Sequence, residues 1–106
     1  MVWIAGQTAS DKNNTVIGTT LDEQVDVAAD NVKKALEAVG ASVDNLVHVQ
    51  YFIAQYDPDT DFPAVLKAGR SLASSRGGSP AAELIGVQSL GLREYRIEIS
   101  GVAVLP

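Results

Sequence analysis

One segment, residues 46–53, limits the folds open to this chain more than any other, because it is apolar on both of its alternating faces. Its β-branched and aromatic residues predict a strand. One face carries Val47, Val49, Tyr51 and Ile53, and the other carries Leu46, His48, Gln50 and Phe52. The first face suits a covering helix, whereas the second is too apolar to lie in open water. The sequence therefore predicts a sheet with helices on one side and further protein on the other.

Two helices are predicted, one before this strand and one after it. Thr20 and Glu23 have the spacing of a capping box, in which the threonine hydroxyl accepts from the amide of Glu23 and the glutamate carboxylate bonds back to Thr20. Apolar residues then recur every three or four positions up to Gly40, which predicts an amphipathic helix and its end. The second helix is expected from about residue 62 to residue 75, with Phe62, Val65, Leu66, Gly69 and Leu72 facing inward.

Four more strands complete the expected topology. They are residues 2–5, 15–17, 82–87 and 95–104, and the first two are expected to form a hairpin across a polar turn. The predicted order is β-β-α-β-α-β-β, which is typical of split βαβ folds. We therefore expect a single α/β (α+β) domain over residues 1–106, with a mixed sheet and two helices on one face.

The charge balance bears on the expected partners. The 106 residues contain 13 acidic and 8 basic side chains, which gives a net charge of −5. Nonspecific binding to nucleic acid depends on lysine and arginine displacing counterions, so no nucleic-acid partner is expected. No run approaches the roughly 20 apolar residues that cross a bilayer, and no basic leader precedes the first strand. Cysteine is absent as well. We expect no membrane partner and a cytoplasmic location.

Few side chains in the sequence point to chemistry. Glu98 lies within an apolar strand, and a partly buried carboxylate can act as a general base or position water. Its alternative role is an ion pair with Arg96 or with a cation of another chain. His48 is the only histidine, and no acid that would orient it is evident, so an interface role is expected. One histidine without cysteine cannot form a zinc site within one chain, and no metal or cofactor is expected.

Several separated motifs occur in a set order along the chain. They are Ile4-Ala5-Gly6-Gln7, residues 31–40 of the first helix, Ser79-Pro80-Ala81, and Ile97-Glu98-Ile99 followed by Val102-Ala103-Val104. Together they resemble the reactive intermediate deaminase family, RidA/YjgF, over nearly the whole chain, beginning at what is usually the family's second strand. The resemblance implies a chorismate-mutase-like fold and a homotrimer with small-molecule clefts between subunits, which accounts for the second covered face.

The same resemblance implies a site. Glu98 matches the glutamate that helps to place hydrolytic water in active deaminases, and it is the catalytic candidate. An arginine that holds the carboxylate of an imino acid is usual at the position of Ala82, and alanine cannot replace its paired hydrogen bonds. Ala5 stands where serine or threonine is usual and Leu66 where asparagine is common, so the cleft is expected to be more apolar. The expected ligand-binding residues are Ala5, Gly6, Leu66, Ala82 and Leu84.

Several functions stay open on these residues. The leading hypothesis is a homotrimer that binds a small, less anionic metabolite between subunits and lacks the usual imine deaminase activity. The first alternative is a cofactor-independent deaminase, a hydrolase that converts 2-imino or 2-enamino acids to 2-keto acids and ammonia, with Arg93, Arg96 or another chain's arginine as the carboxylate binder. An endoribonuclease or translation inhibitor is disfavoured by the acidic balance and the single histidine. A structural interaction module is the remaining class.

Overall fold

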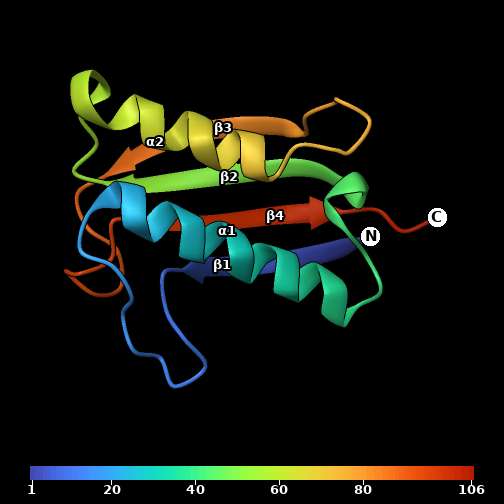
Figure 1. Cartoon of the computed structure of the whole chain (residues 1–106), viewed down its shortest axis with the longest axis horizontal. Helices are drawn as coiled ribbons and strands as arrows, with labels where there is room; N and C mark the ends of the chain where they lie inside the picture. Colours follow the sequence, from blue (N-terminus) through green and yellow to red (C-terminus); the bar gives the residue numbers. More distant parts are fainter.

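The computed structural model describes residues 1–106, in which four strands form one mixed sheet. In chain order the elements are β1 (Val2–Thr8), α1 (Leu21–Ala38), the short 3-10 helix η1 (Val43–Asn45), β2 (Leu46–Ala54), α2 (Pro58–Ser71), β3 (Ala81–Val87) and β4 (Ile97–Ala103). The sheet order is β1-β4-β2-β3, and both helices lie on one face of the sheet (Figure 1). The predicted α+β fold, with a mixed sheet and two helices on one face, is confirmed.

The strand pairing explains why helices connect the strands. β2 and β3 are parallel neighbours, and β4 is antiparallel to both β1 and β2. β1 therefore runs parallel to β2, with β4 between them. A parallel pair needs a long crossover, which α1 supplies between β1 and β2 and α2 supplies between β2 and β3. β1 and β3 are therefore the edge strands of the sheet.

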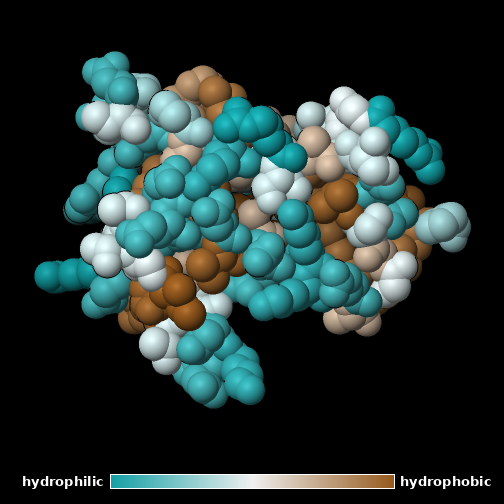
Figure 2. Space-filling model, in the orientation of Figure 1, coloured by the Kyte–Doolittle hydropathy of each residue, from teal (hydrophilic) through white to brown (hydrophobic).

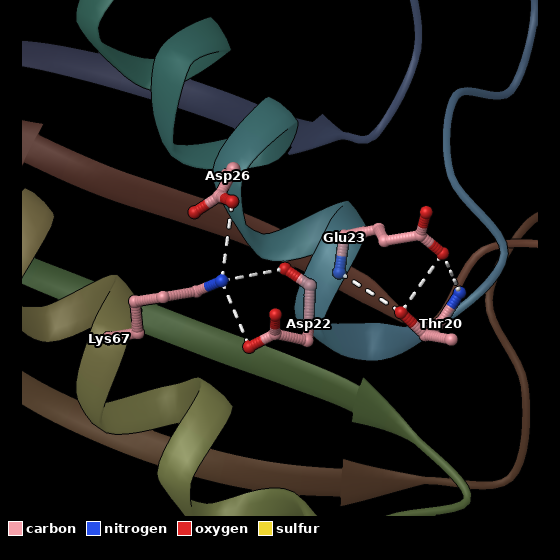
Figure 3. Close-up of polar contacts among 5 residues, drawn as sticks. All are labelled: Thr20, Asp22, Glu23, Asp26 and Lys67. Atoms are coloured by element: carbon pink, nitrogen blue, oxygen red, sulfur yellow. Dashed lines mark hydrogen bonds and ion pairs between the residues drawn. The ribbon is translucent and has the colours of Figure 1, made fainter.

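The start of α1 is the predicted capping box. The Thr20 hydroxyl accepts a hydrogen bond from the amide of Glu23 at 3.2 Å, and the Glu23 carboxylate accepts from the amide of Thr20 at 3.1 Å (Figure 3). The hydrogen bonds that the Glu23 carboxylate accepts lower its pKa, and the bond from the amide of Thr20 has the largest effect. After the helix, Gly40 has a φ of +76°, the left-handed conformation that glycine adopts without strain. Local residues thus fix both ends of α1.

The two helices are joined at the surface by Lys67 of α2. Its ammonium group lies 2.9 Å from the carboxylate of Asp22 and 3.2 Å from that of Asp26, both on α1 (Figure 3). The bond to Asp22 is the main reason that the pKa of Lys67 is raised. The two aspartates are 70% and 67% exposed, and exposed ion pairs of this kind stabilise proteins little. The packing of the helices must therefore rest on apolar contacts beneath them.

Those apolar contacts follow the alternation predicted for β2. Val49, Tyr51 and Ile53 are buried under the helices, together with Ile97 and Ile99 of β4. α1 and α2 contribute Leu21, Val25, Val32, Leu36 and Val65 to this core, and Leu72 adds to it directly after α2. Successive side chains of a strand point to opposite faces, so the other face of the sheet carries the residues between these positions.

Val47 departs from the predicted alternation. It is 47% exposed, whereas Leu46, which was expected on the opposite face, is buried in the core. The pairing of β2 with β4 shifts register between Leu46 and His48, and such a bulge turns the following side chain to a different side.

The predicted strand at residues 15–17 is wrong. Only one isolated bridge forms there, between Ser10 and Val16. The Asp11 carboxylate accepts hydrogen bonds from the amides of Asn13 and Thr15 at 2.8 and 2.9 Å, so local bonds occupy groups that a strand ladder would use. The observed order is β-α-β-α-β-β.

The predicted start of the second helix is also wrong. α2 begins at Pro58 rather than residue 62, because Asp57 caps it by accepting from the amide of Asp59 at 3.0 Å and proline suits the first helical position. Phe62 and Leu66, expected inward, are 46% and 47% exposed. Val65 and Leu72 are buried as expected, and the buried residues of α2 besides Val65 are Asp61, Ala64 and Ala68.

The two faces of the molecule differ in what they expose. Hydrophilic side chains cover most of the helix-bearing side, with separate hydrophobic areas between them (Figure 2). No helix is both long and apolar enough to cross a membrane. On the opposite side the sheet has no protein layer, and Trp3 of β1 is 76% exposed beside its partner Val102.

Candidate functional site

A groove of about 400 Å³ lies between α2 and the edge strand β3. It contains three of the residues expected to bind a ligand, Leu66, Ala82 and Leu84. The strand register explains their direction, because Ala82 and Leu84 pair with Val49 and Tyr51, which face the helices. Ala82 and Leu84 therefore point toward the helix layer, where Leu66 and Phe62 of α2 form the opposite wall.

The groove contains a few polar groups on its apolar walls. Arg70, in the last turn of α2, and Ser79, just before β3, both line it. The Arg70 side chain takes part in no ion pair and no hydrogen bond. Burial raises the pKa of the Tyr51 phenol, which also lines the groove, so this group is a neutral donor across the ordinary pH range. The sequence analysis did not identify Arg70 as a site residue, because only the fold places β3 beside this face of α2.

The other candidate residues lie on the opposite face of the sheet. Glu98 is flanked in β4 by the buried Ile97 and Ile99, so its side chain points away from the helices. A Cβ atom built on Gly6 would lie 2.6 Å from the Glu98 carboxylate oxygen, which means that the carboxylate lies directly over Gly6. Only glycine allows this close approach. Ala5 and Gly6 form an irregular part of β1, where its pairing with β4 shifts register.

Arg96 is not the partner of Glu98. The guanidinium of Arg96 donates to the Asp61 carboxylate at 3.0 Å and to the carbonyl of Ala54 at 3.1 Å. The suggested Glu98–Arg96 ion pair is therefore wrong, and Arg96 is not free to bind a ligand carboxylate within this chain. Glu98 itself takes part in no ion pair with another residue.

His48 has the acidic partner that the sequence analysis could not identify. Its Nε2 atom lies 2.7 Å from one carboxylate oxygen of Glu83 and 2.8 Å from the other. Gln50 donates to the same carboxylate at 3.3 Å and accepts from the hydroxyl of Ser100 at 3.3 Å. The register of β2 against β3 places Gln50 opposite Glu83, and this register is not visible in the sequence. These four side chains form a polar row across the open face of the sheet.

The hydrogen bonds of the polar row lead to a testable prediction for the pKa of Glu83. The hydrogen bond from His48 is the main cause that lowers the pKa of Glu83, and the bond from Gln50 adds to it. His48→Ala is therefore expected to raise the pKa of Glu83 toward the usual glutamate value, as measured by NMR titration of its carboxyl carbon. Because the pKa is lowered in the folded state, this contact stabilises the fold above the ordinary glutamate pKa and ceases to do so as the pH falls through the folded value.

The Gln50→Ala variant is the control for this titration. It removes the weaker hydrogen bond and should raise the pKa of Glu83 less than His48→Ala does. An unchanged Glu83 titration in His48→Ala would contradict the assignment.

Within one chain, the candidate residues thus form two separate groups. Leu66, Ala82 and Leu84 lie in the groove on the helix side, whereas Gly6 and Glu98 lie together on the open side. No group of three or more histidine, aspartate or glutamate side chains is arranged to hold a metal ion.

Comparison with known proteins identifies the family. The family model described as endoribonuclease L-PSP matches residues 1–105. The chain belongs to this family. A relative from Dermatophagoides farinae, a 2-iminobutanoate/2-iminopropanoate deaminase, is 28% identical over 105 residues, which cover 98% of this chain and 77% of that protein.

Solved structures of the RidA/YjgF family have the same fold. The Rid family protein YyfB of Yersinia pestis is 29% identical and superposes with a TM-score of 0.90, covering 98% of this chain and 77% of that one. The YjgF gene product of E. coli is 27% identical, with a TM-score of 0.79, and the match covers 96% of this chain and 78% of that chain. The resemblance found in the separated sequence motifs is therefore confirmed.

Proposed function

We propose that this RidA/YjgF family member binds a small metabolite in clefts between the subunits of a homotrimer, without the usual imine deaminase activity. The observation that carries the proposal is Ala82 in the groove. At this position the family resemblance implies an arginine, whose guanidinium donates two parallel hydrogen bonds to a carboxylate. The methyl group of Ala82 donates none, and the neighbouring wall residues Leu66 and Leu84 are also apolar.

The uncovered sheet face supports assembly with further copies of the chain. Trp3 is 76% exposed there, and Phe52 is partly exposed on the same face, with the polar row between them. A large exposed aromatic side chain beside polar groups on an uncovered sheet is typical of a subunit interface. Assembly also accounts for the two separate groups of candidate residues, because an interface between copies can bring Glu98 and Gly6 of one subunit to the groove of another.

A second candidate function is imine deamination. It is favoured by the similarity to the Dermatophagoides farinae protein, which is named a 2-iminobutanoate/2-iminopropanoate deaminase. In that case Glu98 would position the hydrolytic water, and a guanidinium other than one at position 82 would bind the carboxylate. The net charge of −5 continues to disfavour the endoribonuclease function that the family description mentions.

An activity assay separates these two functions. We expect the decay of 2-iminobutanoate, released by an amino-acid oxidase, to proceed at the buffer rate with the wild-type protein. Ala82→Arg should accelerate the decay, because it returns a guanidinium to the groove. The matched control is Ala81→Arg, since Ala81 pairs with His48 and points to the opposite face. Acceleration by the wild-type protein would refute the proposal in favour of deamination.

Binding and assembly are tested separately. A screen of anionic, cationic and uncharged metabolites should contain compounds that raise the melting temperature, because a ligand of the native state stabilises it by mass action. Light scattering should give the mass of a trimer. A screen without any thermal shift would contradict ligand binding, and a monomer at micromolar concentration would contradict the shared cleft.

A further inference from the structure

A second cavity, called here the loop hollow, lies where the loop after β1 meets the second half of α1. Its volume is about 580 Å³, and all eight residues that line it are polar or charged. The loop projects from the end of β1 (Figure 1), and Figure 2 shows hydrophilic side chains over this projection. Because β1 and β3 are opposite edges of the sheet, the loop hollow is separate from the groove between α2 and β3.

Hydrogen bonds within the chain hold the loop in one shape. The side chain of Asn31, on α1, donates to the carbonyls of Thr8 and Ser10 at 2.9 and 2.8 Å. The Asp11 carboxylate accepts from two amides of the loop at 2.8 and 2.9 Å. A ligand that binds here does not have to order the loop, which lowers the entropy cost of binding.

Two cations of the loop hollow have no counter-ion. Lys12 of the loop and Lys34 of α1 both line it, and neither takes part in an ion pair. Asp26 and Asp30 share a neighbouring cavity with Lys34, and neither forms an ion pair with it. The loop hollow thus contains two ammonium groups and one carboxylate, that of Asp11, in a chain whose net charge is −5. This local excess of positive charge favours an anionic ligand.

The chemistry of the walls narrows the class of anion. An ammonium group is a compact point charge that suits phosphate, whereas a guanidinium pairs with a planar carboxylate. Oδ2 of Asp11 and Oδ1 of Asn31 accept no hydrogen bond within the chain, so both can accept from hydroxyl groups of a ligand. No aromatic or apolar residue lines the walls, so a nucleobase would find no surface on which to stack.

We propose that the loop hollow is a binding site for a sugar phosphate. Lys12 and Lys34 bind the phosphate, and Asp11 and Asn31 accept hydrogen bonds from the sugar hydroxyls. The inference does not depend on the function proposed for the groove. The alternative role of the two lysines is to keep an exposed surface in solution, and that role requires no preference between a sugar phosphate and its parts.

The experiment therefore compares ribose 5-phosphate with ribose and with inorganic phosphate. The amide signals of Asn13, Asn14 and Asn31 report binding by NMR. We expect ribose 5-phosphate to bind the wild-type protein more tightly than either part alone, and more weakly as salt is added. Lys34→Gln should weaken this binding by about ten-fold, in line with the loss of one charged hydrogen bond.

Lys33→Gln is the matched control, because Lys33 is the neighbouring residue of α1, lies outside the loop hollow and carries the same charge. It should bind ribose 5-phosphate as the wild-type protein does. Equal affinities of the Lys33→Gln and Lys34→Gln variants would overturn the assignment of the loop hollow. Unshifted amide signals with ribose 5-phosphate, or equally tight binding of inorganic phosphate, would overturn the sugar phosphate as ligand. Tighter binding of uridine 5′-monophosphate would overturn it in favour of a nucleotide.

Discussion

Replacement of Gln24 by alanine is expected to lower the free energy of unfolding by about 3 to 5 kcal/mol. Gln24 is a fully buried side chain of α1 that holds three backbone groups. Its amide nitrogen donates to the carbonyls of Glu94 at 2.6 Å and Gly18 at 3.2 Å, and its oxygen accepts from the amide of Arg96 at 2.7 Å. Alanine would leave these groups without partners and open a cavity beside them, and both effects are costly.

Two further variants separate the causes of this loss. Gln24→Met fills most of the volume without the hydrogen bonds, so a loss close to that of alanine would assign the effect to unsatisfied backbone groups. Gln88→Ala is the matched control, because Gln88 is exposed after β3 and should change stability by less than about 0.5 kcal/mol. Denaturant unfolding measures all three variants. A loss below about 1 kcal/mol in Gln24→Ala would contradict the role given to this residue.

Asp61→Ala is expected to cost about 3 kcal/mol, because it leaves the guanidinium of Arg96 without its partner in a mostly buried place. The Asp61 side chain is only 12% exposed, and its carboxylate accepts from Arg96 at 3.0 Å and from the amide of Asp57 at 2.9 Å. Arg96 in turn donates to the carbonyl of Ala54. This set of bonds fastens the first turn of α2 to the ends of β2 and β4.

The control for Asp61 is its neighbour Asp59, which is exposed and outside the ion pair. Asp59→Ala removes the same charge from the same helix and should cost well under 1 kcal/mol. The double variant Asp61→Ala, Arg96→Met should be more stable than Asp61→Ala alone, since it no longer buries an unpaired cation. Thermal and denaturant unfolding give both comparisons. Equal losses of unfolding free energy in Asp59→Ala and Asp61→Ala would contradict a stabilising role for the ion pair between Asp61 and Arg96.

The features that the sequence predicted correctly depend on near neighbours in the chain. The capping box of Thr20 and Glu23, the glycine that follows α1 and the buried face of β2 each arise within a few residues. Local spacing determines helix caps and strand alternation, so such features can be recognised without a structure. The resemblance of the separated motifs to a known family predicted the overall fold. It did not predict any individual contact between the helices and strands.

The features that the sequence did not predict depend on distant contacts. Gln24 stands among polar and charged residues of α1, and only the fold brings Arg96 and Glu94 to it. In the same way, the pairing of His48 with Glu83 needs the register of β2 against β3. The place of Arg70 in the groove follows from the packing of α2 beside β3, which the sequence does not show.

The position of β4 has a consequence for the order in which the protein can fold. Of the four strands, β4 is synthesised last, yet it pairs with β1 on one side and with β2 on the other. Until residues 97–103 have emerged, β1 has no neighbour in the sheet, and β2 can pair only with β3. Nascent chains therefore keep two strand edges unpaired until β4 has emerged, and unpaired edges favour aggregation at this stage.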